Sequence, residues 1–112
     1  MNQEDIEQIK VVHWIKENTT LPVIHIANQR ATSPYHGAML KRMGVRAGVS
    51  DLFIPRATNF YHGLFIELKT LTGKASKLQM QFNKEMHEEG YEAVFAYGAD
   101  EAIFIIKDFY DI

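Results

Sequence analysis

The stretch 50-SDLFIPRATNFYHGLFIELK-69 decides how this chain folds. It contains two apolar runs, DLFIP (51–55) and LFIELKT (64–70), separated by a turn-forming segment. Runs of this length are typical of neighbouring β-strands. Both runs carry charge: Asp51 opens the first, and Glu67 and Lys69 lie near the end of the second. A buried charge is costly unless it is paired or binds a metal, so these three positions require an explanation.

The alternation of side chains along a strand brings the charged residues together. Phe65, Glu67 and Lys69 share one face of the second strand, because successive side chains point to opposite faces. If the two strands pair as neighbours, Asp51 lies beside Glu67 at the end of the sheet. Two adjacent carboxylates repel each other and raise one pKa, and a divalent cation removes that conflict. Oxygen ligands favour Mg²⁺ or Mn²⁺ over zinc, so we predict such a site at Asp51 and Glu67.

Lys69 beside this site predicts metal-assisted hydrolysis. The ammonium group can hold a water, or the hydroxide formed from it, against a phosphate whose oxygen the metal polarises. The alternative is an ion pair between Glu67 and Lys69 at the strand end, with Asp51 as a turn residue. The E-x-K tripeptide alone favours that alternative. The longer pattern, an Asp followed by apolar-apolar-Glu-apolar-Lys in acid-poor surroundings, favours the metal site.

The remainder of the chain predicts an α/β fold with a mixed central β-sheet flanked by α-helices. Helices are expected at 3–17, 76–89 and 99–109, further strands at 23–27 and 92–97, a loop at 28–37 and a helical turn at 38–44. The helix between the strands 64–70 and 92–97 implies a crossover that makes those strands parallel. A length of 112 residues predicts a single domain, 1–112.

Charge is unevenly distributed along the chain, although the formal net charge is only −2. Between residues 18 and 84 there are nine bases and only two acids, which are Asp51 and Glu67. A basic stretch of this kind is typical of binding to a polyanion, and the alternative is a solvated basic face. The candidate phosphate contacts are Arg30, Lys41, Arg42, Arg46 and Lys74.

Several other classes of protein are disfavoured. There are no cysteines, so disulfides and thiolate metal sites are excluded and a reducing cytoplasm fits. The five histidines form no H-E-x-x-H motif, so a zinc site is not expected. No apolar run approaches the ~18 residues of a membrane-spanning helix, and MNQEDIEQIK does not have the pattern of a signal peptide.

Three segments together resemble a known family. These are G44-V-R-A-G-V-S-D-L52, L64-F-I-E-L-K69 and S76-K-L-Q79-M-Q-F82, with Gly90 beyond. They are similar to the VRR-NUC (virus-type replication-repair nuclease) family of the PD-(D/E)XK nuclease superfamily, in a form close to the stand-alone proteins of phages and prophages. The resemblance implies a restriction-endonuclease-like core and a place in the cytoplasm of a bacterial host.

The resemblance also implies roles for individual residues. Asp51 and Glu67 match the family's metal ligands, Leu68 would add its backbone carbonyl, and Lys69 matches the catalytic lysine. Ser50 stands where the family usually has proline, which affects the turn rather than the ligand.

Two helical residues complete the expected site. Gln79 matches a site glutamine, although Ser76-x-x-Gln79 is also a capping box, and both roles could hold. Glu4 matches the acid on the first helix and would reach a metal directly or through water. Glu7 is the competing candidate for that role.

We therefore expect an Mg²⁺- or Mn²⁺-dependent, structure-specific DNA endonuclease. The resemblance suggests a four-way (Holliday) junction as substrate, and cutting two opposed strands suggests a two-fold homodimer. The alternatives are a nuclease that acts on flaps or other branched DNA, a non-catalytic nucleic-acid-binding module that keeps the fold, and an interaction domain whose charges are structural.

Overall fold

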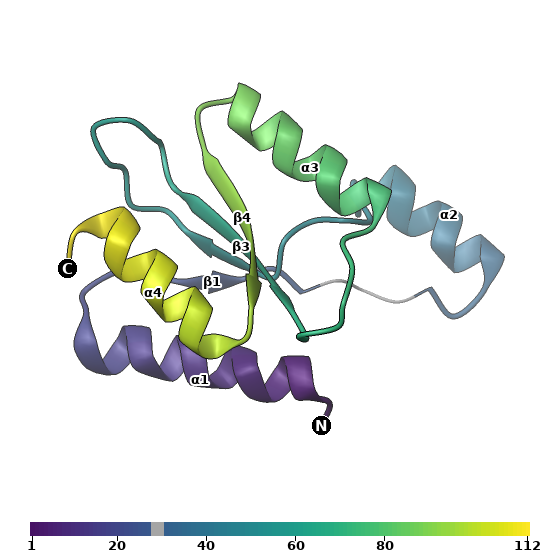
Figure 1. The fold of residues 1–112 in the computed structure, drawn as a ribbon. Helices are drawn as coiled ribbons and strands as arrows, with labels where there is room; N and C mark the ends of the chain where they lie inside the picture. Colours follow the sequence, from purple (N-terminus) through teal and green to yellow (C-terminus); the bar gives the residue numbers. More distant parts are fainter. Residues whose placement is uncertain (28–30) are drawn as a thin grey trace.

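A computed structural model describes residues 1–27 and 31–112, and it contains a four-stranded mixed sheet flanked by helices (Figure 1). The elements are α1 (Gln3–Asn18), β1 (Ile24–His25), α2 (Pro34–Arg42), β2 (Leu52–Ile54), β3 (Leu64–Lys69), α3 (Lys77–Glu88), β4 (Glu92–Tyr97) and α4 (Ala99–Tyr110). The strand order is β1-β2-β3-β4. The β1–β2 and β2–β3 pairs are antiparallel and β3–β4 is parallel, as the crossover through α3 predicted.

Helices cover both faces of the central strand β3, and all six of its residues are buried. Ile66 and Leu68 point to the face covered by α1 and α4, where they pack in one apolar cluster with Ile15 and Ile106. Phe65 points to the opposite face, where it packs against Phe82 of α3. Glu67 and Lys69 share the face of Phe65, so their charged groups lie beneath α3 and out of bulk water.

The pairing of β2 with β3 fixes where Asp51 lies. Leu52 pairs with Ile66, so Asp51, one residue before β2, is level with Glu67. The backbone continues the sheet at this point, because the Ile26 N–H donates to the Asp51 carbonyl at 2.8 Å. β1 and β2 are shorter than the strands predicted at 23–27 and 51–55, but the neighbouring arrangement that the site requires is present.

Helix α2 differs from the sequence-based expectation. A loop was predicted over 28–37 and a helical turn over 38–44, whereas α2 begins at Pro34 and ends at Arg42. Ser33 is the N-cap, its Oγ accepts a hydrogen bond from the His36 N–H at 3.1 Å, and Pro34 follows at the first helical position. Ser-Pro is a turn signal but also a strong start signal for a helix, so the loop prediction was wrong for 34–37.

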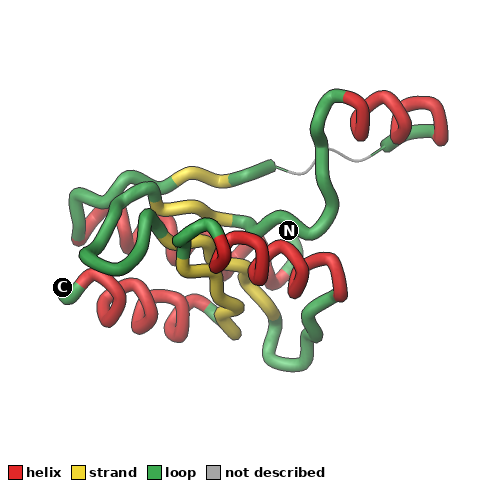
Figure 2. The backbone as a smooth tube through the Cα atoms, turned by 90° about the horizontal axis from the view of Figure 1, so that it is seen from above, coloured by secondary structure: helices red, strands yellow, loops and turns green. Residues whose placement is uncertain are grey.

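α2 also differs from the other helices in its surroundings. Within residues 1–27 and 31–112, it makes no close contact with another helix or with a strand. Figure 2 shows it projecting from the end of the molecule, away from the layered body. None of the helices described within residues 1–27 and 31–112 combines the length and apolar character that a membrane span needs.

Candidate active site

Asp51 and Glu67 lie side by side where β2 and β3 meet. Asp51 is held in place by the backbone of β3, because its Oδ2 accepts a hydrogen bond from the Leu68 N–H at 2.8 Å. Glu67 retains only 7% of its surface accessible. The strand geometry therefore brings the two acids together, with Glu67 buried and Asp51 partly buried, and the sequence predicted this proximity.

The environment of Glu67 is unfavourable for a lone carboxylate. Burial, together with the neighbouring Asp51, raises the pKa of Glu67 to about 8, although the positive charge of Lys69 opposes both effects. A cation bound between the two acids would relieve this repulsion, and carboxylate oxygens are the ligands that Mg²⁺ and Mn²⁺ prefer. The residues present therefore fit a hard divalent cation. Across the described positions no three His, Cys, Asp or Glu side chains form one metal-binding group, so the acids here are a pair.

Gln79 connects Lys69 to Glu67. The Lys69 ammonium donates to Gln79 Oε1 at 2.6 Å, and Gln79 Nε2 donates to Glu67 Oε2 at 3.3 Å. Lys69 is only 9% exposed, so these contacts fix the position of a largely buried cation. One amide side chain thus orients both the lysine and one of the acids.

The same glutamine completes the capping box of α3. The Ser76 N–H donates to Gln79 Oε1 at 3.0 Å, and the Gln79 N–H donates to Ser76 Oγ at 3.1 Å. The capping role of Gln79 is therefore present, and its contacts with Lys69 and Glu67 are those that a role in the site would require. The two roles are compatible because the start of α3 lies against the end of β3, so an N3 side chain reaches both.

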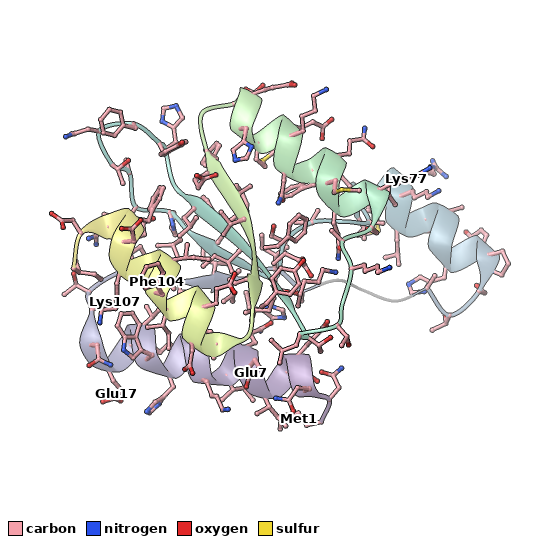
Figure 3. The ribbon with its side chains drawn as sticks, viewed as in Figure 1. Met1, Glu7, Glu17, Lys77, Phe104 and Lys107 are labelled. Atoms are coloured by element: carbon pink, nitrogen blue, oxygen red, sulfur yellow. The ribbon has the colours of Figure 1, made fainter. Side chains whose placement is uncertain are left out.

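The two acids on α1 have different surroundings. Glu7 accepts a hydrogen bond from the Ala99 N–H at 3.1 Å and pairs with Lys10 at 3.0 Å. The bond from Ala99 is the main reason that the pKa of Glu7 is lowered. Figure 3 shows Glu7 beside the start of α4. Glu4 is exposed one turn earlier, and its charge adds to the effects of burial and Asp51 in raising the pKa of Glu67. The metal-ligand role of Glu4 stays a prediction.

The candidate phosphate contacts that the structure describes lie on different elements, although Lys41 and Arg46 line the same cavity. Arg46 forms an ion pair with Glu85 of α3, and its guanidinium lies 5.5 Å from the centre of the Phe82 ring. Lys41 and Arg42 are exposed in the last turn of α2, and Lys74 is exposed in the loop between β3 and α3. Arg30 lies outside the described residues.

Residues next to the site also include some that the sequence did not single out. Tyr97 pairs with Lys69 across the parallel β3–β4 ladder, and both line a cavity of about 390 Å³ together with Gln3 and Leu71. Ser50, directly before Asp51, is fully buried, and its Oγ has no hydrogen-bond partner among the residues that the structure describes. Tyr97 could be found only from the register between β3 and β4, which pairs it with Lys69. The serine before Asp51 is evident in the sequence, but its burial is not.

Comparison with known proteins places this geometry in a family. The model of the VRR-NUC domain matches residues 1–100. The chain belongs to the VRR-NUC family. A solved structure described as a VRR_NUC domain protein is 34% identical, and the match covers 99% of this chain and 90% of the other with a TM-score of 0.83. No curated protein matches the chain. The VRR-NUC assignment confirms the α/β fold and indicates a nuclease-type domain that acts on nucleic acid.

Proposed function

We propose that this VRR-NUC protein is a metal-dependent DNA endonuclease that hydrolyses phosphodiester bonds with Mg²⁺ or Mn²⁺. The observation that supports it best is the contact network of Asp51, Glu67, Lys69 and Gln79 at the end of β3. A purely structural ion pair with Lys69 would need only one acid. Here Asp51 and Glu67 lie side by side, and Lys69 donates to the side-chain amide of Gln79.

Each residue has a distinct part in this proposal. Asp51 and Glu67 would hold the cation, with the Leu68 carbonyl as a further ligand and Glu4 reaching the cation through water. When bound, the cation supplies positive charge to the phosphate and lowers the pKa of water. Lys69 orients the attacking water and stabilises the negative charge that develops on the phosphate. Gln79 keeps Lys69 directed at the site.

The substrate in this proposal is branched DNA, with a four-way junction as the first candidate. Symmetric cutting of two opposed strands requires two sites, and a two-fold homodimer supplies them. Two surfaces are candidates for the contact between copies. One is the apolar stretch of α4 that includes Phe104, which is 69% exposed (Figure 3), and the other is α1.

A single cleavage assay tests the proposal. The purified protein would be offered four-way junction, flap, single-stranded and linear duplex DNA with Mg²⁺, Mn²⁺, Ca²⁺ or a chelator. We expect cleavage of a branched substrate with Mg²⁺ or Mn²⁺, none with chelator, and loss of cleavage in Lys69→Ala. Binding without cleavage under all conditions would instead identify a non-catalytic module, and cleavage of flaps alone would exclude junction resolution.

A further inference from the structure

Helix α2 projects from the body of the protein (Figure 2). It spans nine residues, and none of the other helices or strands described here packs closely against it. An isolated helix this short is marginal in water, because helices below ~12–15 residues gain too little to offset nucleation. Apart from the buried Leu40, most of the surface of α2 is therefore left free for another molecule.

The chemistry of α2 indicates what that molecule is. From residue 18 to residue 50 the chain contains four bases and no acid. Lys41 and Arg42 are exposed in the last turn of α2, and in the described structure neither forms an ion pair with a carboxylate. Arg46, by contrast, is paired with Glu85. The end of α2 is thus a local concentration of positive charge that the protein does not neutralise.

A protein partner is less compatible with this surface. The large exposed apolar side chains near α2 are Tyr35, which is 76% exposed, and Met43. They lie at opposite ends of the helix, roughly 12 Å apart along its axis at 1.5 Å per residue, so they do not form one apolar patch. Leu40 is already buried. Charge complementarity with a polyanion is the stronger signal.

We propose that α2 is a DNA-binding arm that contacts backbone phosphates of the substrate beside the cleavage site. This inference rests on the proposed function for the identity of the polyanion, but not on catalysis. Lys41 and Arg42 supply the contacts, and such contacts position a protein on DNA without reading its sequence. The arm extends the footprint on duplex DNA beyond the site at the end of β3.

Equilibrium binding tests the arm separately from the chemistry. Fluorescence anisotropy with a labelled duplex-armed DNA in Ca²⁺ would compare wild type with the double variant Lys41→Ala/Arg42→Ala over a range of salt concentrations. The expected result is about tenfold weaker binding and a log–log salt slope smaller by about 2, since each phosphate contact contributes roughly 0.9.

Two controls and three outcomes make the test decisive. The exchange Lys41→Arg/Arg42→Lys keeps the charge and should keep the DNA affinity. Lys107→Ala removes a base from α4 instead (Figure 3), and it should also keep the affinity. An unchanged affinity and salt slope in the folded double variant would overturn the arm while wild-type cleavage still stood. Binding with the expected loss but no cleavage by wild type would support the arm and defeat the proposed function. A change of oligomeric state instead of DNA affinity would show that α2 contacts a second copy, which also overturns the proposal.

Discussion

Glu67 is a buried carboxyl group next to a second acid, and this has a consequence for stability. Because burial raises its pKa from 4.5 to about 8, the folded metal-free protein favours the protonated form. The unfolded chain releases that proton near pH 4.5. The stabilisation that protonated Glu67 gives the folded protein is therefore fully present below pH 4.5. It is lost as pH rises to about 8, by no more than about 1.4 kcal/mol per pH unit.

The stability of the metal-free protein should therefore depend on pH through Glu67. In EDTA, the free energy of unfolding of wild type should fall from pH 5 to pH 8, and Glu67→Gln should lack that part of the decline because glutamine does not titrate. Urea unfolding of both proteins at each pH measures the difference. Addition of Mg²⁺ at pH 8 should stabilise wild type more than the variant. Parallel pH profiles for the two proteins would contradict this account of Glu67.

Gln79 contributes both to the cap of α3 and to the position of Lys69, and these roles can be separated. Ser76→Ala removes one capping hydrogen bond, and Gln79→Ala removes the other together with the contacts to Lys69 and Glu67. Each should cost about 1 kcal/mol of stability. Only Gln79→Ala should also lower kcat, by on the order of tenfold or more. Unfolding and single-turnover cleavage should be measured on the same samples. An equal loss of activity in the two variants would refute the positioning role of Gln79.

At the scale of elements, Glu7 ties α1 to α4. The N-cap of α4 is Gly98, which offers no side-chain acceptor, and Glu7 provides one to the Ala99 N–H. This contact fixes the position of α1 and therefore of Glu4, which lies one turn earlier.

We predict that Glu7→Ala lowers Tm and raises the Mg²⁺ concentration for half-maximal cleavage several-fold, because Glu4 is displaced. Glu7→Gln keeps an acceptor oxygen and should restore most of both properties. Glu17→Ala is the matched control, since it removes an exposed acid from the last part of the same helix (Figure 3). A lower Tm with an unchanged Mg²⁺ requirement would mean that the tether does not position Glu4.

The elements also show what the sequence could and could not predict. The alternation in 64–70 was sufficient to place Glu67 and Lys69 on one face, because the alternation of side chains is a local property of a strand. Asp51 was placed beside them on the condition that the two strands pair as neighbours, and the β2–β3 pairing meets it. It could not predict that Arg46 pairs with Glu85, since that contact joins residues 39 apart in sequence. The start of α2 was missed because Ser33-Pro34 favours both a turn and a helix N-terminus.

At the scale of the whole molecule, the proposed homodimer makes a prediction about mass and product pattern. Phe104 borders a cavity of about 490 Å³ on α4 that Ile103 and Ile112 also line. If this face joins two copies, light scattering should give twice 12.9 kDa for wild type, and Phe104→Asp should shift the mass to 12.9 kDa. The variant should then nick one junction strand at a time. A monomeric wild type would exclude the homodimer, and a dimeric Phe104→Asp would direct attention to Ile9 on α1, which is also exposed.

The central claim is that Asp51 and Glu67 hold a divalent cation, and calorimetric titration with Mn²⁺ tests it most directly. Wild type should show saturable binding, Asp51→Asn should lose it, and Asp108→Asn, an exposed acid on α4, should retain it. Circular dichroism would confirm that each variant is folded. Equal Mn²⁺ affinity in wild type and Asp51→Asn would contradict the account.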